Sequence, residues 1–181
     1  MNFFLIPLLL LNVQTSSIDN KYNYHTQKAD IYYHRGNYPN MIFHLKEKIK
    51  LDKHDIGTYA DIAYYYWSMS VDDVKRRKEF QLKALDTLIE GLKNNRTSAD
   101  MLDEVGNFFL HNLKDLDSAM PFYEQSIKMK NPRMSTYHFL AAGYFKKGEK
   151  QKSIKTLEDC IKKFPQDEKA KSKLKELKKD Q

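Results

Sequence analysis

Residues 134–165 read MSTYHFLAAGYFKKGEKQKSIKTLEDCIKKFP. Apolar and small side chains recur at helical spacing on both sides of Gly148, and the stretch ends at Pro165. This spacing predicts two amphipathic helices joined by a turn. A single helix pair of this kind cannot bury its apolar side alone, so the rest of the chain should supply similar pairs that stack on it.

Three further stretches repeat the pattern, with fidelity that decreases toward the N-terminus. Residues 99–132 match it with one extra residue near Lys114. Residues 56–97 hold both halves of a pair, but these lie about nine residues too far apart for the usual period. We expect this surplus to form an overlong second helix capped at Ser70. Residues 22–53 fit least well, as suits a terminal repeat with one partly exposed side.

The residues that carry this pattern resemble the tetratricopeptide repeat family. In the strongest unit they are Tyr137, Leu140, Ala141, Tyr144, Gly148, Ser153, Leu157, Cys160 and Pro165. The resemblance implies an all-α fold: a right-handed α-solenoid of about four helix pairs in residues 18–165. A Lys-rich capping helix would follow in residues 166–181, with Asp167 as its cap. Small residues at Ala63, Gly106 and Ala141 would let the two helices of each pair approach closely.

The composition is that of a folded helical protein. Of 181 residues, 41% are hydrophobic and 13% aromatic, and six Gly and five Pro leave little turn chemistry for many short strands. The net charge of +7 is concentrated at one end, because residues 141–181 carry thirteen Lys against seven acidic residues, a net of +6. A solvated helix face explains this distribution more simply than a phosphate-binding patch does.

Residues 1–17 form an apolar run followed by small polar residues, which is typical of a secretory signal peptide. The run is too short to span a bilayer. We expect export, to a periplasm or out of the cell, if this leader is cleaved, and a cytoplasmic protein otherwise. An uncleaved N-terminal helix that covers the end of the stack is the alternative. Asn95 begins an N-glycosylation sequon, usable only in a eukaryotic secretory pathway.

In members of the resembled family the first helices of the pairs line a concave groove that accepts a peptide. The partner-binding residues implied here are Tyr33, Asp61, Tyr64, Trp67, Asp103, Glu104, Asn107, His111, His138 and Phe145. Such a groove is aromatic with an acidic centre, which suits a protein or peptide segment with apolar and basic side chains. Trp67 is the leading anchor candidate, and the sequence favours neither a core nor a groove position for its side chain. Co-chaperone members clamp a terminal carboxylate with Lys, Asn and Arg; only Asn107 matches, which disfavours that function.

No sequence motif indicates chemistry. The chain has no Gly-rich phosphate loop, no paired-histidine metal motif and no serine-nucleophile turn. Its one cysteine, Cys160, occupies a small-residue position and is interpreted as a buried, inert thiol. His111 and His138 are solitary imidazoles that could face each other across the groove. We therefore predict no enzyme, no cofactor and no metal.

The sequence thus predicts a non-catalytic interaction scaffold or assembly factor. The alternative is a protein that binds an anionic surface, nucleic acid or membrane, through its Lys-rich C-terminal helix. Nucleic acid is the weaker form of that alternative, because few aromatic residues accompany the lysines. Deleting the chain after Pro165 is expected to abolish binding in the alternative and to change little in the groove hypothesis.

Overall fold

Every regular element in the range that the structure describes is a helix. The computed structural model describes the backbone from Leu5 to Lys179 and the side chains from Ser17 onward. The helices gather into two units, the first ending at Asn94 and the second beginning at Asn95, and each is described here by itself. The all-α class predicted from the sequence is confirmed.

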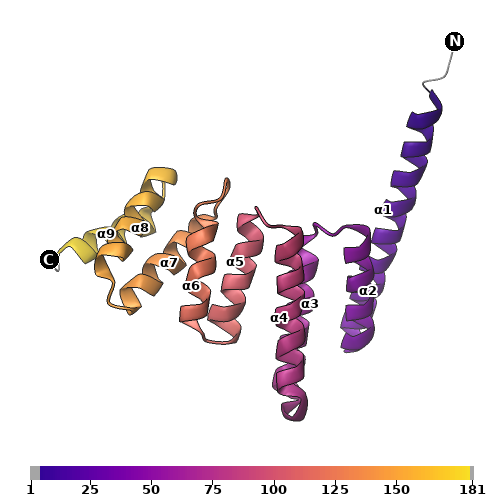
Figure 1. The fold of residues 1–181 in the computed structure, drawn as a ribbon, viewed down its shortest axis with the longest axis horizontal. Coiled ribbons are helices and arrows are strands. Elements are labelled where there is room, and N and C mark those ends of the chain that lie inside the picture. The colour runs from indigo at the N-terminus through magenta and orange to yellow at the C-terminus, as the bar shows by residue number, and fades with distance from the viewer. Residues whose placement is uncertain (1–4, 180–181) are drawn as a thin grey trace. The chain divides into compact units, whose positions relative to one another are not determined.

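The first unit consists of two antiparallel helix pairs (Figure 1). Its helices are α1 (Leu5–His34), α2 (Tyr38–Leu51), α3 (Ile56–Asp72) and α4 (Arg77–Asn94), with a 3-10 turn, η1 (Val74–Arg76), before the last. Gly36 lets the chain turn sharply after α1, because its φ of +65° is costly for residues with a side chain. The side chain of Asn37 then accepts a hydrogen bond from the Asn40 N–H and so caps α2.

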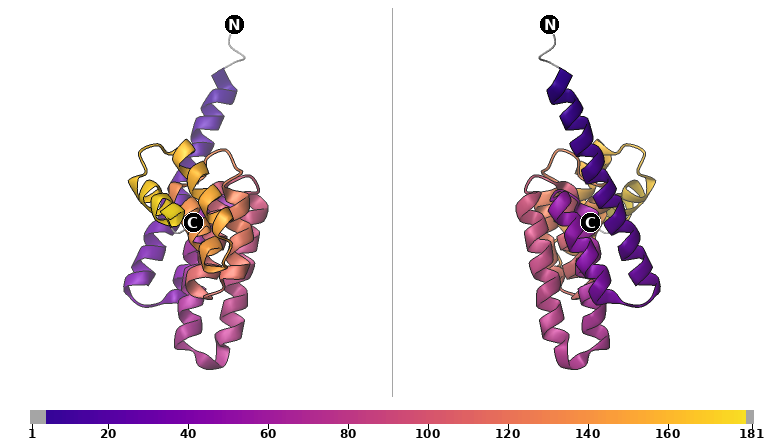
Figure 2. Two further views of the ribbon diagram at one scale, coloured as in Figure 1. Left: turned by 90° about the vertical axis from the view of Figure 1, so that its left-hand side faces the viewer. Right: turned by 90° about the vertical axis from the view of Figure 1, so that its right-hand side faces the viewer.

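The surplus residues of the second repeat are shared between its two helices. The predicted cap at Ser70 is wrong: Ser70 is buried inside α3, and its hydroxyl donates to the carbonyl of Trp67. The turn lies at Asp73 instead, whose carboxylate accepts from the Arg76 N–H. Both α3 and α4 are therefore long, with 17 and 18 residues. Figure 2 shows them as a long hairpin closed at one end by η1.

Asp55 ties three helices of the first unit together. It caps α3 by accepting from the N–H and the hydroxyl of Thr58, it accepts from the hydroxyl of Tyr22 in α1, and it lies 3.6 Å from Nζ of Lys48 in α2. Burial raises the pKa of Asp55, but the hydrogen bonds from Thr58 and Tyr22 lower it by more, so that the pKa is lowered overall.

Acid should therefore weaken the first unit through Asp55. A carboxylate whose pKa is lowered on folding adds stability above its unfolded value of about 4 and loses it as the pH falls through the folded value. We expect the melting temperature of Asp55→Asn to fall less than that of the wild type between about pH 5 and 2. Parallel curves for the two proteins in thermal melts across this range would contradict the role given to Asp55.

The second unit contains α5 (Ala99–Asn107), α6 (Leu116–Ser126), α7 (Met134–Lys146), α8 (Lys150–Lys163) and α9 (Glu168–Lys179). A π-helical turn, η2 (Phe108–Asn112), extends α5, and the Leu113 N–H donates to the carbonyl of Phe108 five residues earlier. The extra residue expected near Lys114 is thus absorbed by a widened helical turn. Lys114 itself adopts a φ of +58°, which re-aims the chain toward α6.

The small residues that the repeat pattern places between paired helices are buried, and two of them contact the partner helix. Ala63, Gly106 and Ala141 are all buried. Gly106 packs beneath the ring of Tyr123: a Cβ added at Gly106 would lie 2.7 Å from Tyr123 Cε1. The hydroxyl of Ser153 in α8 donates to the carbonyl of Ala141 in α7 at 2.8 Å. These contacts confirm the predicted pairing of helices within the second unit.

The predicted leader, residues 1–17, lies almost wholly outside the residues whose side chains are described. From Leu5 its backbone forms the first turns of α1. Export stays a prediction, which the intact mass of the protein isolated from its source cells tests. Among the described residues, no helix has both the length and the apolar character needed to cross a membrane.

Candidate functional site

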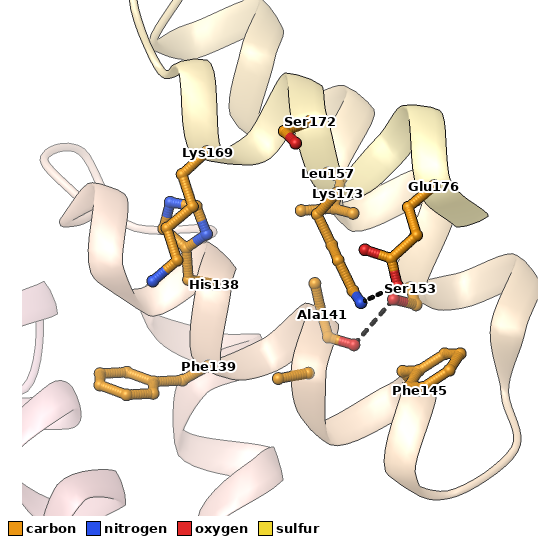
Figure 3. A pocket seen from close by; sticks show the side chains of 11 residues that line it. His138, Phe139, Ala141, Phe145, Ser153, Leu157, Lys169, Ser172, Lys173 and Glu176 are labelled. Atoms are coloured by element: carbon orange, nitrogen blue, oxygen red, sulfur yellow. Dashed lines mark hydrogen bonds and ion pairs between the residues drawn. The ribbon is translucent and has the colours of Figure 1, made fainter. Parts of the chain in front are cut away.

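The second unit has an open cavity of about 670 Å³ between α7, α8 and α9. Two predicted groove residues, His138 and Phe145, line it from α7 together with Phe139 and Ala142. Figure 3 shows side chains of α9 pointing across the cavity toward those of α7. Ala141 and Leu157 add apolar surface. An aromatic and aliphatic lining of this size fits the side chains of a bound segment.

The rim of this cavity is basic. Lys173 of α9 pairs with Glu176 at 2.6 Å, and its ammonium lies 5.4 Å from the ring centre of Phe145. Lys169 is exposed on the same rim and has no ion-pair partner among the described residues. Phe145 is 48% exposed although it is a large apolar side chain. The cavity therefore offers an apolar surface beside one uncompensated positive charge.

The predicted acidic centre in α5 is corrected. Asp103 is buried, with 3% of its surface exposed, and one oxygen accepts from the Thr136 hydroxyl of α7 at 2.7 Å. Its other oxygen, Oδ1, has no hydrogen-bond partner among the described residues. Glu104 is half-buried and pairs with Arg133 at 3.1 Å, and Arg133 also holds Asp100 at 2.6 Å. Neither acid is thus a free surface charge for a basic partner.

Burial of the charged Asp103 side chain destabilises the folded protein at neutral pH. Removal from water raises its pKa, so the folded protein favours the protonated form and stability is lost as the pH rises above about 4. We expect Asp103→Asn to raise the melting temperature at pH 7, because the amide can still accept from Thr136 and carries no charge. A lower melting temperature for Asp103→Asn at pH 7 than for the wild type would show that the carboxylate is needed in its charged form.

The two other predicted residues of this region are engaged inside the unit. Asn107 is half-buried, and its side-chain oxygen accepts from the hydroxyl of Tyr123 at 2.9 Å. His111 is exposed in η2, and its ring meets Phe139 edge-on with 5.4 Å between the centroids. Asn107 reaches the cavity wall through Tyr123, whose ring stacks on Phe139, and His111 contacts Phe139 directly. Neither residue lines the cavity itself.

The first unit holds a separate cavity of about 350 Å³ between α1, α2 and α3. Tyr33 and Asp61, both predicted, line it together with Asp30 and Tyr65. The rings of Tyr33 and Tyr65 lie 5.8 Å apart. Asp30 and Asp61 are exposed at this cavity, and Lys48 also lines it.

Tyr64 and Trp67 lie outside the residues that line this cavity. Tyr64 is 54% exposed, Trp67 is half-buried, and their rings lie 6.2 Å apart. The sequence left open whether the side chain of Trp67 lies in the core or in the groove, and in the structure this side chain is half-buried. Its role as an anchor stays a prediction.

Three side chains of the second unit meet at one point that the sequence did not predict. Nε2 of His138 in α7 lies 2.7 Å from Oδ2 of Asp167, and the thiol of Cys160 in α8 donates to the same oxygen at 3.3 Å. Asp167 caps α9 as predicted, since its Oδ1 accepts from the Ala170 N–H at 3.1 Å. Burial and the adjacent carboxylate raise the pKa of Cys160 to about 12, which favours the protonated thiol.

Sequence reasoning missed Arg133 and the partners of Cys160. Arg133 directly precedes α7, and the repeat register, which sets first helices side by side, could have placed it near the acids of α5. His138 and Asp167 lie in different elements from Cys160, and only the docking of three elements brings them together. No spacing along the chain signals that contact.

Comparisons with known proteins identify the repeat and the fold. A family model described as a tetratricopeptide repeat matches residues 105–132. The crystal structure of MamA protein is 18% identical, with a TM-score of 0.58, and the match covers 88% of this chain and 81% of that one. A thermophilic TPR protein of Thermus thermophilus is 15% identical over 95% of this chain and 94% of its own, with a TM-score of 0.57. PilW, a widely conserved type IV pilus biogenesis factor, is 19% identical over 87% and 68%, with a TM-score of 0.55. No curated protein matches the sequence.

Proposed function

Since residues 105–132 are a tetratricopeptide repeat and the chain has the fold of such proteins, we propose that it is a non-catalytic interaction scaffold. It binds a partner protein through the cavity between α7, α8 and α9. The observation that carries this proposal is the open, mainly apolar cavity of about 670 Å³, with Phe145 exposed at its edge. A similar structure belongs to a pilus biogenesis factor, which supports an assembly role.

The chemistry of the cavity defines the partner segment. An apolar side chain would fill the space between Phe139, Ala142 and Leu157 and remove their surface from water. A carboxylate near that anchor would meet Lys169, whose charge no described acid compensates. The cavity of the first unit carries Asp30 and Asp61 beside Lys48, which is already paired with Asp55, so its exposed carboxylates suit a basic side chain. The basic side chains predicted for the partner would therefore bind to the first unit, and its apolar anchor would bind to the second.

Peptide selection on the intact chain tests this function. We expect peptides enriched from a random displayed library to share an apolar residue with an acidic neighbour. Ala142→Arg should weaken the selected peptides at least about tenfold, because a long charged side chain would enter the cavity from an exposed position. Ala142→Ser is the matched control and should bind as the wild type does.

A second pair of variants distinguishes binding in the cavity from non-specific binding to exposed aromatic rings. Phe145→Ala removes an exposed ring at the cavity edge, whereas Phe43→Ala removes one that is 55% exposed on α2. Only the first change should lower affinity for the peptides selected on the intact chain. Equal losses in both variants, or no loss in either, would refute binding in this cavity.

The anionic-surface alternative has its own observation. Lys171, Lys175, Lys178 and Lys179 surround an open cavity of about 470 Å³ that also touches Ile161 and Leu174. Two of these lysines are already compensated, since Lys171 pairs with Glu168 and Lys178 with Glu158. The remaining charge is small for a phosphate-binding surface, so we favour the partner cavity.

Deleting the chain after Pro165 cannot discriminate the two functions, because α9 forms one wall of the partner cavity. A double charge reversal, Lys175→Glu with Lys179→Glu, avoids that wall. The alternative predicts that this variant loses salt-sensitive binding to anionic vesicles or nucleic acid. The scaffold function predicts unchanged binding of selected peptides.

A further inference from the structure

The cluster of His138, Cys160 and Asp167 brings three different ligand chemistries to one buried point. One imidazole nitrogen, one thiol sulfur and one carboxylate oxygen lie within 4.8 Å of one another. His138 has 16% of its side chain exposed and Asp167 3%, and Cys160 is fully buried. Each comes from a different helix or helix entrance: α7, α8 and the residue before α9.

The type of ligand narrows the choice of metal. Calcium and magnesium prefer sites made of oxygen atoms, and this cluster offers only one oxygen-bearing side chain. Zinc accepts thiolate, imidazole and carboxylate in a tetrahedral site. We propose that His138, Cys160 and Asp167 form a three-ligand site for a zinc-like divalent metal ion.

Protons and charges balance when the metal enters. The Cys160 thiol releases its proton to solvent and binds as a thiolate. The proton on Nε2 of His138, which is donated to Asp167 in the metal-free protein, also leaves to solvent while Nδ1 takes one up, so that the imidazole stays neutral and binds through Nε2. The thiolate and the carboxylate then compensate the two positive charges of the ion. Oδ2 of Asp167, which accepts from both neighbours in the metal-free protein, becomes the oxygen ligand.

The residues around the cluster orient its carboxylate and leave one side of the cluster accessible to solvent. The Ala170 N–H holds the second oxygen of Asp167, Oδ1, at 3.1 Å, and such outer contacts fix the direction of a ligating carboxylate. His138 also lines the partner cavity, so the cluster faces solvent on that side. The ion would join α7, α8 and α9, the three helices that enclose the cavity.

Cobalt substitution tests the site directly. The full-length protein is stripped with chelator, kept reduced with a thiol-free reductant and titrated with Co²⁺. We expect a thiolate-to-cobalt charge-transfer band that saturates at about one ion per chain and is removed by excess Zn²⁺. The melting temperature of the stripped protein should rise with Zn²⁺ concentration, because the folded state alone holds the assembled site.

Variants that keep the fold make the test specific. Cys160→Ser can still donate a hydrogen bond to Asp167, and Asp167→Asn can still cap α9, so both should fold. Cys160→Ser should abolish the charge-transfer band, and His138→Gln and Asp167→Asn should weaken cobalt binding at least about tenfold. His111→Gln, a change at an exposed histidine outside the cluster, should leave the titration unchanged.

Three results would overturn the proposal: the absence of a thiolate band in the wild type at saturating Co²⁺, a band that persists in Cys160→Ser, and a band that disappears equally in His111→Gln. Loss of the zinc-dependent rise in melting temperature in Cys160→Ser, but not in His111→Gln, would support the site independently of the spectrum.

Discussion

Tyr123→Ala should lower the free energy of unfolding by about 3–5 kcal/mol, the usual cost of truncating a buried aromatic side chain. Tyr123 is fully buried in the second unit, and its ring stacks on Phe139 with 5.7 Å between the centroids. It also fills the space above Gly106, where no side chain stands. Because Phe139 lines the partner cavity, the same change should loosen the cavity wall.

Two companion variants separate packing from the hydrogen bond. Tyr123→Phe keeps the ring and loses only the bond to Asn107, so it should cost about 1 kcal/mol. Phe43→Ala removes an exposed ring and should stay within about 0.5 kcal/mol of the wild type. Urea unfolding followed by circular dichroism measures all three. A cost for Tyr123→Ala no larger than that of Tyr123→Phe would contradict the packing described for α5 and α6.

Asp167→Ala is the second large effect, with an expected cost of about 2–4 kcal/mol in chelator-treated protein. The change removes the cap of α9, which is worth about 0.5–2 kcal/mol. It also leaves two donors, Nε2 of His138 and the thiol of Cys160, without their acceptor, at about 1–3 kcal/mol.

The neighbouring Glu168→Ala provides the control. Glu168 has 81% of its side chain exposed and pairs with Lys171 one turn later, so its loss should change stability by about 0.5 kcal/mol or less. Asp167→Asn retains a capping side chain and should fall between the two. If Asp167→Ala and Glu168→Ala unfold at the same urea concentration, the buried network around Asp167 contributes nothing.

The helices and their pairing could be predicted because they follow from local spacing. Ala63, Gly106 and Ala141 are buried as their small-residue positions in the repeat predict, because larger side chains there would hold the paired helices apart. The cap at Asp167 is equally local, since the residue stands three positions before a helical N–H that it accepts from. The second repeat was harder, because Ser70 and Asp73 are both good caps and only packing selects Asp73.

The candidate site could be predicted only in part, because side-chain burial depends on the next repeat. Asp103 lies on α5 where an open groove was expected, but Thr136 of α7 covers it. Arg133 lies in a loop, and its pairing with Asp100 and Glu104 removes the acidic centre. By contrast, His138 and Phe145 of α7 line the cavity whose opposite wall is α9, and their part in partner binding stays a prediction.

Chemical-shift mapping with a selected peptide tests the central claim most directly, that α7 and α9 of the second unit form the partner-binding surface. We expect the amide signals of Ala142, Leu157 and Lys173 and the methyl signals of Ala142 and Leu157 to shift on titration, and the amide signals of Lys175 and Lys179 to stay unchanged. Saturable shifts centred on Lys175 and Lys179, with Ala142 and Leu157 unaffected, would contradict it.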